Sequence, residues 1–142
     1  MSACLVGWNC RYDGGSKLSK EILALASKEG WSLAPACPEV LGGLGIPREP
    51  ATIIGGDGKA VIEGKARVMD KSGRDVTRQF VTGAKKTLEI AQRTCCVKAI
   101  FKENSPSCGV NFITDAEGRA IKGMGVAAAL FYSRNIPVEG RS

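Results

Sequence analysis

The chain contains no histidine in its 142 residues, and this absence argues against several common kinds of catalytic site. Serine and cysteine hydrolases usually need a histidine as the base that activates the nucleophile. The motif G-x-S-x-G, which presents a nucleophilic serine in many hydrolases, is also missing. We therefore do not expect a hydrolase with a histidine-dependent catalytic triad.

Long apolar runs and aromatic residues are also scarce. No apolar run approaches the roughly 20 residues that a membrane-spanning helix needs, and the first residues do not resemble a secretory signal. We expect a cytoplasmic protein with no membrane partner. Aromatic residues make up only 6% of the chain, and the basic residues behind its net charge of +6 are spread out. Nucleic acid is therefore a possible partner but not a favoured one.

Six cysteines are present, and three of them lie in loop-forming segments. Cys10, Cys37 and Cys108 stand beside Gly, Pro or Asn in NCRYDGG, ACPEVLGG and ENSPSCG. A disulfide framework is disfavoured because such frameworks belong mainly to small secreted domains with poor cores. Three thiolates could instead hold three irons of a [4Fe–4S] cluster and leave the fourth iron open. The alternatives are small buried apolar side chains and zinc, for which no histidine is available.

The order of the expected elements indicates an α/β fold. Strands are expected at 3–7, 31–36, 97–102 and 136–140, helices at 17–30, 75–93 and 123–135, a long ordered loop at 40–58, a short strand or hairpin within 59–70, and a hairpin at 110–123. This order favours a single domain over residues 1–142, with a mainly parallel sheet flanked by helices. Ligands of such sheets bind beyond the carboxyl ends of the strands. Each of the three cysteine loops follows an expected strand, so we expect these cysteines to meet at one edge.

Polar side chains accompany the three cysteines. Glu39 lies in the Cys-Pro-Glu segment, where a carboxylate near a cluster can take or deliver a proton; its alternative role is a surface residue or a cap. Ser105 and Ser107 precede Cys108, and their hydroxyls can hydrogen-bond a substrate or the cluster sulfurs. The sequence Asn-Ser-Pro-Ser is also a turn signal by itself.

Several other residues have both a possible functional role and a possible structural role. Asp13, followed by two glycines, can bind a ligand or make a tight turn. Arg11 and Arg48 are candidates for contacting an anion or a carbonyl oxygen, or they are solvated charges. Cys4 is expected to pack inside the first strand, since free cysteines are often buried. The adjacent cysteines at 95–96 are assigned to packing at the opposite end of the 97–102 strand.

Five segments resemble motifs of the bacterial thiouracil desulfidase family: SACLVGWNCRYDGG (2–15), CPEVLGGLGIPREPA (37–51), DVTRQFVTGA (75–84), KENSPSCG (102–109) and GMGVAAAL (123–130). They follow one another in order over nearly the whole chain, and only the set as a whole is specific. The resemblance implies an oxygen-sensitive [4Fe–4S] cluster held by three cysteines. It also implies that the iron without a protein ligand takes the sulfur of a thiocarbonyl base and that water replaces this sulfur.

Carried onto matching positions, the resemblance implies that Cys10, Cys37 and Cys108 are the cluster ligands. It implies that Glu39 transfers protons and that Ser105 supplies a functional hydroxyl. We expect the substrate to be contacted by Ser107, Asp13 and Arg48. The expectations for Asp13 and Arg48 rest on the residues themselves and not on the resemblance.

The sequence therefore predicts a desulfidase that converts thiouracil to uracil and hydrogen sulfide without net redox change. One alternative is a desulfurase acting on 4-thiouridine in tRNA. Related proteins that act on thiolated tRNA carry an additional domain, whereas the five segments quoted above all belong to the single desulfidase-like domain. We therefore expect a free base or nucleoside as the substrate. The other alternative is a redox-sensing module that holds an iron–sulfur cluster without turnover.

Overall fold

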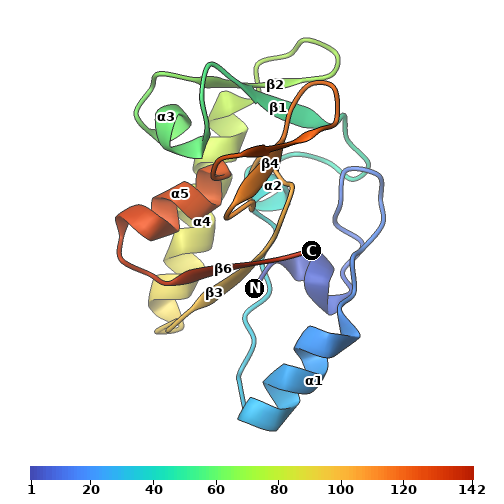
Figure 1. Cartoon of the computed structure of the whole chain (residues 1–142), viewed down its shortest axis with the longest axis vertical. Helices are drawn as coiled ribbons and strands as arrows, with labels where there is room; N and C mark the ends of the chain where they lie inside the picture. The colour runs from blue at the N-terminus through green and yellow to red at the C-terminus, as the bar shows by residue number, and fades with distance from the viewer.

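The computed structural model describes all of residues 1–142 as one mixed α/β domain (Figure 1). In chain order its elements are the 3-10 helix η1 (Ala3–Val6), α1 (Lys20–Glu29), α2 (Pro38–Leu41), β1 (Ala51–Ile54), α3 (Gly58–Ile62), β2 (Arg67–Asp70), α4 (Thr77–Arg93), β3 (Ala99–Lys102), β4 (Phe112–Thr114), β5 (Ala120–Lys122), α5 (Val126–Ser133) and β6 (Val138–Arg141). The predicted α/β class, with parallel strand pairing and flanking helices, is confirmed. None of the helices is both long and apolar enough to cross a membrane.

The strands form three separate pairs. β3 and β6 pair in parallel, with Ala99 opposite Val138. The β1–β2 and β4–β5 pairs are both antiparallel, and β4–β5 is the hairpin expected at 110–123. Parallel pairing is thus confined to β3–β6 and one isolated bridge between Ser2 and Ala36, and is less extensive than the sequence suggested.

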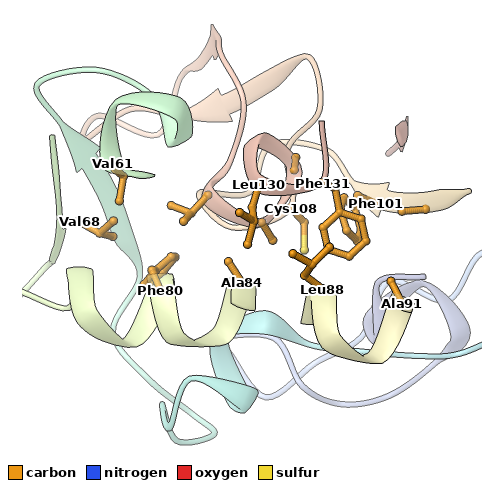
Figure 2. Packing of buried hydrophobic residues seen from close by; sticks show 14 of the residues in the cluster. Val61, Val68, Phe80, Ala84, Leu88, Ala91, Phe101, Cys108, Leu130 and Phe131 are labelled. Carbon is orange, nitrogen blue, oxygen red and sulfur yellow. The ribbon is translucent and has the colours of Figure 1, made fainter. Parts of the chain in front are cut away.

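The long helix α4 organises the main core. Phe80, Ala84, Leu88 and Ala91 lie along one face of it and meet apolar side chains of α3, β2 and α5 (Figure 2). Residues three or four positions apart share one face of a helix, so this face is an apolar stripe along the helix expected at 75–93. On the opposite side of the core, Phe131 of α5 packs edge-to-face on a phenylalanine of β3, with 5.1 Å between the ring centroids. Helix α4 is therefore the surface on which α2, α3, β2 and α5 pack.

Two predicted strands near the N-terminus are not strands. Residues 3–7 form η1, which ends at Gly7 in the left-handed conformation (φ 98°). A short apolar run that is buried on all sides has no period by which a strand can be told from a helix. Residues 31–36 are irregular apart from the Ser2–Ala36 bridge. Ala36 exchanges backbone hydrogen bonds with Met1 and Ala3, so the segment runs beside the N-terminus without becoming a regular strand.

The region expected to be a loop also holds regular structure. Strand β1 lies within 40–58, and α3 begins at the end of that range, where the carboxylate of Asp57 accepts the N–H groups of Lys59 and Ala60. The other predicted helices and strands are present, with α1 beginning after its Ser19 cap and ending at Gly30. The sequence did not predict β1 because Gly and Pro dominate on both sides of it and indicate a loop.

Candidate functional site

The three loop cysteines line one cavity. Cys10 follows η1 and Cys108 follows β3, and both are buried. Cys37 is half-buried at the N-terminal end of α2, with its Sγ 3.7 Å from the carbonyl oxygen of Cys10. The cavity has a volume of about 640 Å³ and is also lined by Glu39, Arg48, Ser105 and Ser107. Segments far apart in the chain therefore bring thiol, carboxylate, guanidinium and hydroxyl groups to one place.

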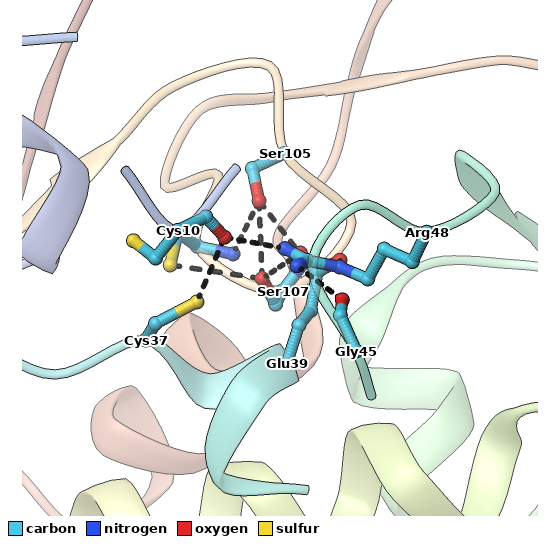
Figure 3. A network of polar contacts seen from close by, with 8 residues as sticks. Cys10, Cys37, Glu39, Gly45, Arg48, Ser105 and Ser107 are labelled. Carbon is cyan, nitrogen blue, oxygen red and sulfur yellow. Dashed lines mark hydrogen bonds and ion pairs between the residues drawn. The ribbon is translucent and has the colours of Figure 1, made fainter. Parts of the chain in front are cut away.

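A continuous polar network joins these groups (Figure 3). Arg48 donates from Nε to Glu39 Oε1 at 3.0 Å and from Nη2 to the Cys10 carbonyl at 2.9 Å. Its Nη1 donates to the Gly45 carbonyl at 3.1 Å. The Ser107 hydroxyl donates to Glu39 Oε2 at 2.8 Å and lies 3.1 Å from the Ser105 hydroxyl. Both oxygens of the Glu39 carboxylate are thus held, one by a cation and one by a hydroxyl.

Helix α2 owes its position to contact with α4 at two glycines. A Cβ atom on Gly83 would lie 1.8 Å from the carbonyl oxygen of Pro38, and one on Gly42 would lie 2.0 Å from that of Gln79. Only glycine therefore permits this approach. Pro38 occupies the first position of α2, where its fixed φ favours a helix start. This seat orients the Cys37 and Glu39 side chains together.

The segment bearing Cys108 is seated in a similar way on the beginning of α5. The N–H of Val126 donates to the carbonyl of Pro106, and the N–H of Ala127 donates to the carbonyl of Ser107. A Cβ atom on Gly125 would lie 2.5 Å from the carbonyl carbon of Ser107. The Cys108 side chain, at one wall of the cavity, also belongs to the main core (Figure 2). Its loop is consequently fixed rather than free on the surface.

Burial sets the electrostatics of the thiols. It raises the pKa of Cys108 to about 12, and burial together with the neighbouring Cys37 raises the pKa of Cys10 to about 12. The pKa of Cys4 is also raised by burial, whereas the pKa of the Lys102 ammonium is lowered by burial. Burial therefore favours the protonated form of the Cys10 and Cys108 thiols in the free protein. A bound cation stabilises the thiolates, so its binding releases protons.

The three cysteines supply thiolate ligands, which are the kind of ligand that iron–sulfur clusters take. No group of three or more Cys, Asp or Glu side chains lies close enough to ligate one ion. The thiolates that hold a cluster each bind a different iron atom, so they need to surround a space rather than meet at a point. Cys10, Cys37 and Cys108 are among the residues that line the cavity.

Seven of the eight predicted site residues line this cavity; the exception is Asp13. The Asp13 carboxylate accepts a hydrogen bond from the N–H of Gly15 at 2.9 Å and lies 3.7 Å from Arg11. These contacts are those of the tight turn, the second of the two roles expected for Asp13. Cys4, assigned to packing from sequence, is buried in η1 but also lines the cavity. Lys102 lines it too, although the sequence did not predict this residue in the site. The position of this lysine, at the end of a core strand and shortly before the Ser-Pro-Ser-Cys turn, was the sequence signal that could have placed it in the site.

The two remaining cysteines lie elsewhere, as expected. Cys95 and Cys96 border a second, mainly apolar cavity of about 600 Å³, formed with residues 31–34 and the end of α4. Cys95 is exposed and Cys96 is half-buried, so the packing role assigned to Cys95 is wrong. Cys95 has a φ of 51°, in the left-handed region, and lies just after the end of α4. Neither cysteine takes part in the polar network.

The fold and the site together define a small α/β protein in which cysteines from three segments surround a cavity beside a held carboxylate. The model of the 2-thiouracil desulfurase family matches residues 1–140, and the chain belongs to this family.

Two relatives are similar over most of the chain. An uncharacterized protein, YbbK of Bacillus subtilis (strain 168), is 46% identical over 132 residues, which are 92% of this chain and 86% of that protein. The solved structure of a [4Fe-4S]-dependent thiouracil desulfidase, TudS, is similar at a TM-score of 0.82 with 38% identity, covering 99% of this chain and 87% of that one. The family and the α/β class predicted from the sequence are thus confirmed.

Proposed function

We propose that this protein is an iron–sulfur-dependent desulfidase that removes sulfur from a thiolated pyrimidine, converting thiouracil and water to uracil and hydrogen sulfide. The convergence of three cysteines from separate segments on a cavity that also contains Glu39 carries this proposal. Cys10, Cys37 and Cys108 would hold a [4Fe–4S] cluster. When bound, a cluster with one iron free of protein ligands supplies a soft Lewis acid suited to the sulfur of a C=S group.

Glu39 is the proton-transfer residue of the proposed reaction. Its Oε2 atom takes a proton from the attacking water, and the proton then goes to the departing sulfur. Arg48 fixes Oε1 and stabilises the negative charge, so the carboxylate keeps its orientation before and after the transfer. Atoms balance, because the oxygen of water enters at the carbon and both of its protons leave with sulfur. No electron acceptor is needed.

The serine hydroxyls orient the reacting groups. The Ser107 hydroxyl donates a hydrogen bond to Glu39, and the Ser105 hydroxyl accepts one from the N–H of Cys108 at 3.1 Å. Both hydroxyls therefore lie on the side of the cavity that carries Cys108. We propose that Ser105 contacts the reacting base and that Ser107 and Arg48 align the carboxylate with the substrate. Asp13 stays a proposal for the outer part of the substrate site, because its exposed carboxylate belongs to the turn that follows Cys10.

We further propose that residues 1–142 act as one domain, because the site draws on segments from Cys10 to Cys108. The cytoplasm is the proposed compartment, because reduced thiols are maintained there. A small thiolated pyrimidine is the proposed partner.

The test is anaerobic reconstitution with iron and sulfide, followed by an iron count, a visible spectrum and an assay of sulfide release from thiouracil. We expect about four irons per chain and sulfide release. Changing Cys10, Cys37 or Cys108 to Ser should lower the iron content, whereas Cys95→Ser, at an exposed position outside the cavity, should leave it unchanged. A protein that stays colourless and free of iron after reconstitution would refute the proposal.

A further inference from the structure

Glu103 places a carboxylate in the interior that makes no ion pair, although the Lys102 ammonium donates to the backbone carbonyl of Glu103 at 2.7 Å. The residue follows β3 and is only 7% exposed. None of the ion pairs in the protein includes it. A buried carboxylate without hydrogen-bond partners would be costly, so its negative charge has to be compensated by other donors.

Backbone N–H groups provide this compensation. The Glu103 carboxylate accepts the N–H of Val110, Asn111 and Phe112, each at 3.1 Å, and the side-chain amide of Asn111 at 2.6 Å. Successive N–H groups that converge on one anion form a nest, and hydrogen bonds to a charged acceptor are stronger than neutral ones. The carboxylate therefore determines the path of residues 110–112.

Strand β6 covers the same carboxylate from another side. A Cβ atom on Gly140 would lie 1.8 Å from Glu103 Oε1, so any larger residue there would collide with it. The parallel register of β3 and β6 places Gly140 opposite Phe101, close to the start of the loop. The surrounding chain is shaped to admit the carboxylate and to keep it in place.

The segment between Glu103 and its N–H donors carries Ser105, Ser107 and Cys108. Its ends are also joined by the N–H of Asn104, which donates to the carbonyl of Phe112 at 3.0 Å. We propose that Glu103 is a positioning residue for the site: its carboxylate closes this loop in the shape that directs Ser107 toward Glu39 and Cys108 into the cavity. The role in desulfuration rests on the proposed function, whereas the closure of the loop does not.

Glu103→Gln tests the closure, because glutamine keeps the shape but turns an NH₂ group toward N–H donors. Hydrogen exchange is measured on the cluster-free protein, with Glu29→Gln at the exposed end of α1 as the control. We expect the amides of 110–112 to lose protection by about tenfold or more, as the loss of hydrogen bonds to a charged group implies. The amides of α4 should keep theirs. Unchanged protection at 110–112 would overturn the proposal.

Reconstituted protein supplies a second readout. In Glu103→Gln, we expect a chelator to remove iron about tenfold faster and kcat to fall more than KM rises, because the loop would hold Cys108 and the serines less well. Glu103→Asp, which keeps the charge on a shorter side chain, should restore part of both losses. Iron release and kcat equal to those of the unchanged protein would contradict the role of Glu103.

If Glu103→Gln does not fold, hydrogen exchange of Glu103→Asp tests instead whether Glu103 positions the loop. Protection lost only at 110–112 supports positioning, whereas equal loss over α4 overturns it in favour of a general effect on stability. Because exchange is followed without the cluster, the result stands even if the unchanged protein releases no sulfide from thiouracil. Failure of the desulfidase proposal and failure of the positioning proposal are thus seen in different experiments.

Discussion

The contact between α2 and α4 predicts whether Gly83→Ala raises or lowers the stability of the protein. Two effects oppose each other there: the higher helix propensity of alanine and the collision of its Cβ atom with α2. Gly83 lies within α4, where replacing glycine by alanine normally stabilises a helix by about 1 kcal/mol. At this position, however, the new Cβ atom would lie 1.8 Å from the Pro38 carbonyl oxygen, whereas ordinary contacts begin at 3.4 Å. Because the obstructing atom belongs to the backbone, Gly83→Ala must displace α2 instead of a flexible side chain.

The magnitude follows from the overlap. Overpacking a well-filled contact costs about 1–3 kcal/mol, and a clash with backbone falls at the upper end of that range. After the gain in helix propensity, we expect a net loss of about 2 kcal/mol. For a domain of this size, the melting temperature should fall by roughly 4–8 °C. Since α2 carries Cys37 and Glu39, a shift on the order of 1 Å should also lower kcat about a hundredfold.

Thermal unfolding of the cluster-free protein, followed by circular dichroism, measures the first effect, and sulfide release by reconstituted protein measures the second. Lys86→Ala, on the exposed face of the same helix, is the matched control and should change neither quantity. If Gly83→Ala melts at a higher temperature and retains full activity, then α2 is not seated on α4 in the way that the structure indicates.

Three further predictions concern the site, the substrate and the response to acid. Glu39→Gln should keep the full iron content while sulfide release falls about a hundredfold or more; undiminished release would mean that another group moves the proton, and a sensor without turnover would show no release in either protein. With thiouracil, kcat/KM should change less than about twofold between 50 and 200 mM salt, whereas a tRNA substrate would show a steep fall. Hydrogen bonds from Thr77 and then the nearby Arg67 lower the pKa of Asp75 to about 2. The stabilisation linked to this lowered pKa is present above the unfolded value near 3.8 and is lost as the pH falls through 2. The difference in melting temperature between the unchanged protein and Asp75→Asn should therefore narrow between pH 4 and pH 2, and a constant difference would contradict the assignment.

Strong periodic signals made much of the fold predictable. The apolar stripe on α4 and the end of α1 at Gly30 follow from helical spacing and end residues, which act locally. The helix expected at 17–30 begins later than predicted, after its Ser19 cap. The run ACLVG was misread because burial on every side removes periodicity, and β1 was missed between Gly- and Pro-rich stretches. These errors occurred where tertiary contacts, not local preference, decide the conformation.

The grouping of the site was predicted for a reason that is only partly right. Cys108 does follow a parallel strand, as the argument from strand ends required. Cys10 follows a 3-10 helix, and Cys37 follows an irregular segment, yet both line the same cavity. Glu103 and its N–H donors could not be found from sequence, because nothing local distinguishes a glutamate in a nest from one in water.

Chain synthesis exposes the parts of this site in a fixed order. Cys10 and Cys37 leave the ribosome long before the N–H groups of Val126 and Ala127 that hold the Cys108 loop. Strand β6, which covers Glu103, is made later still. If the proposed function holds, cofactor assembly on this protein would therefore follow translation. A nascent chain stalled before α5 would have the Cys10 and Cys37 thiols but no formed cavity in which to hold a cluster.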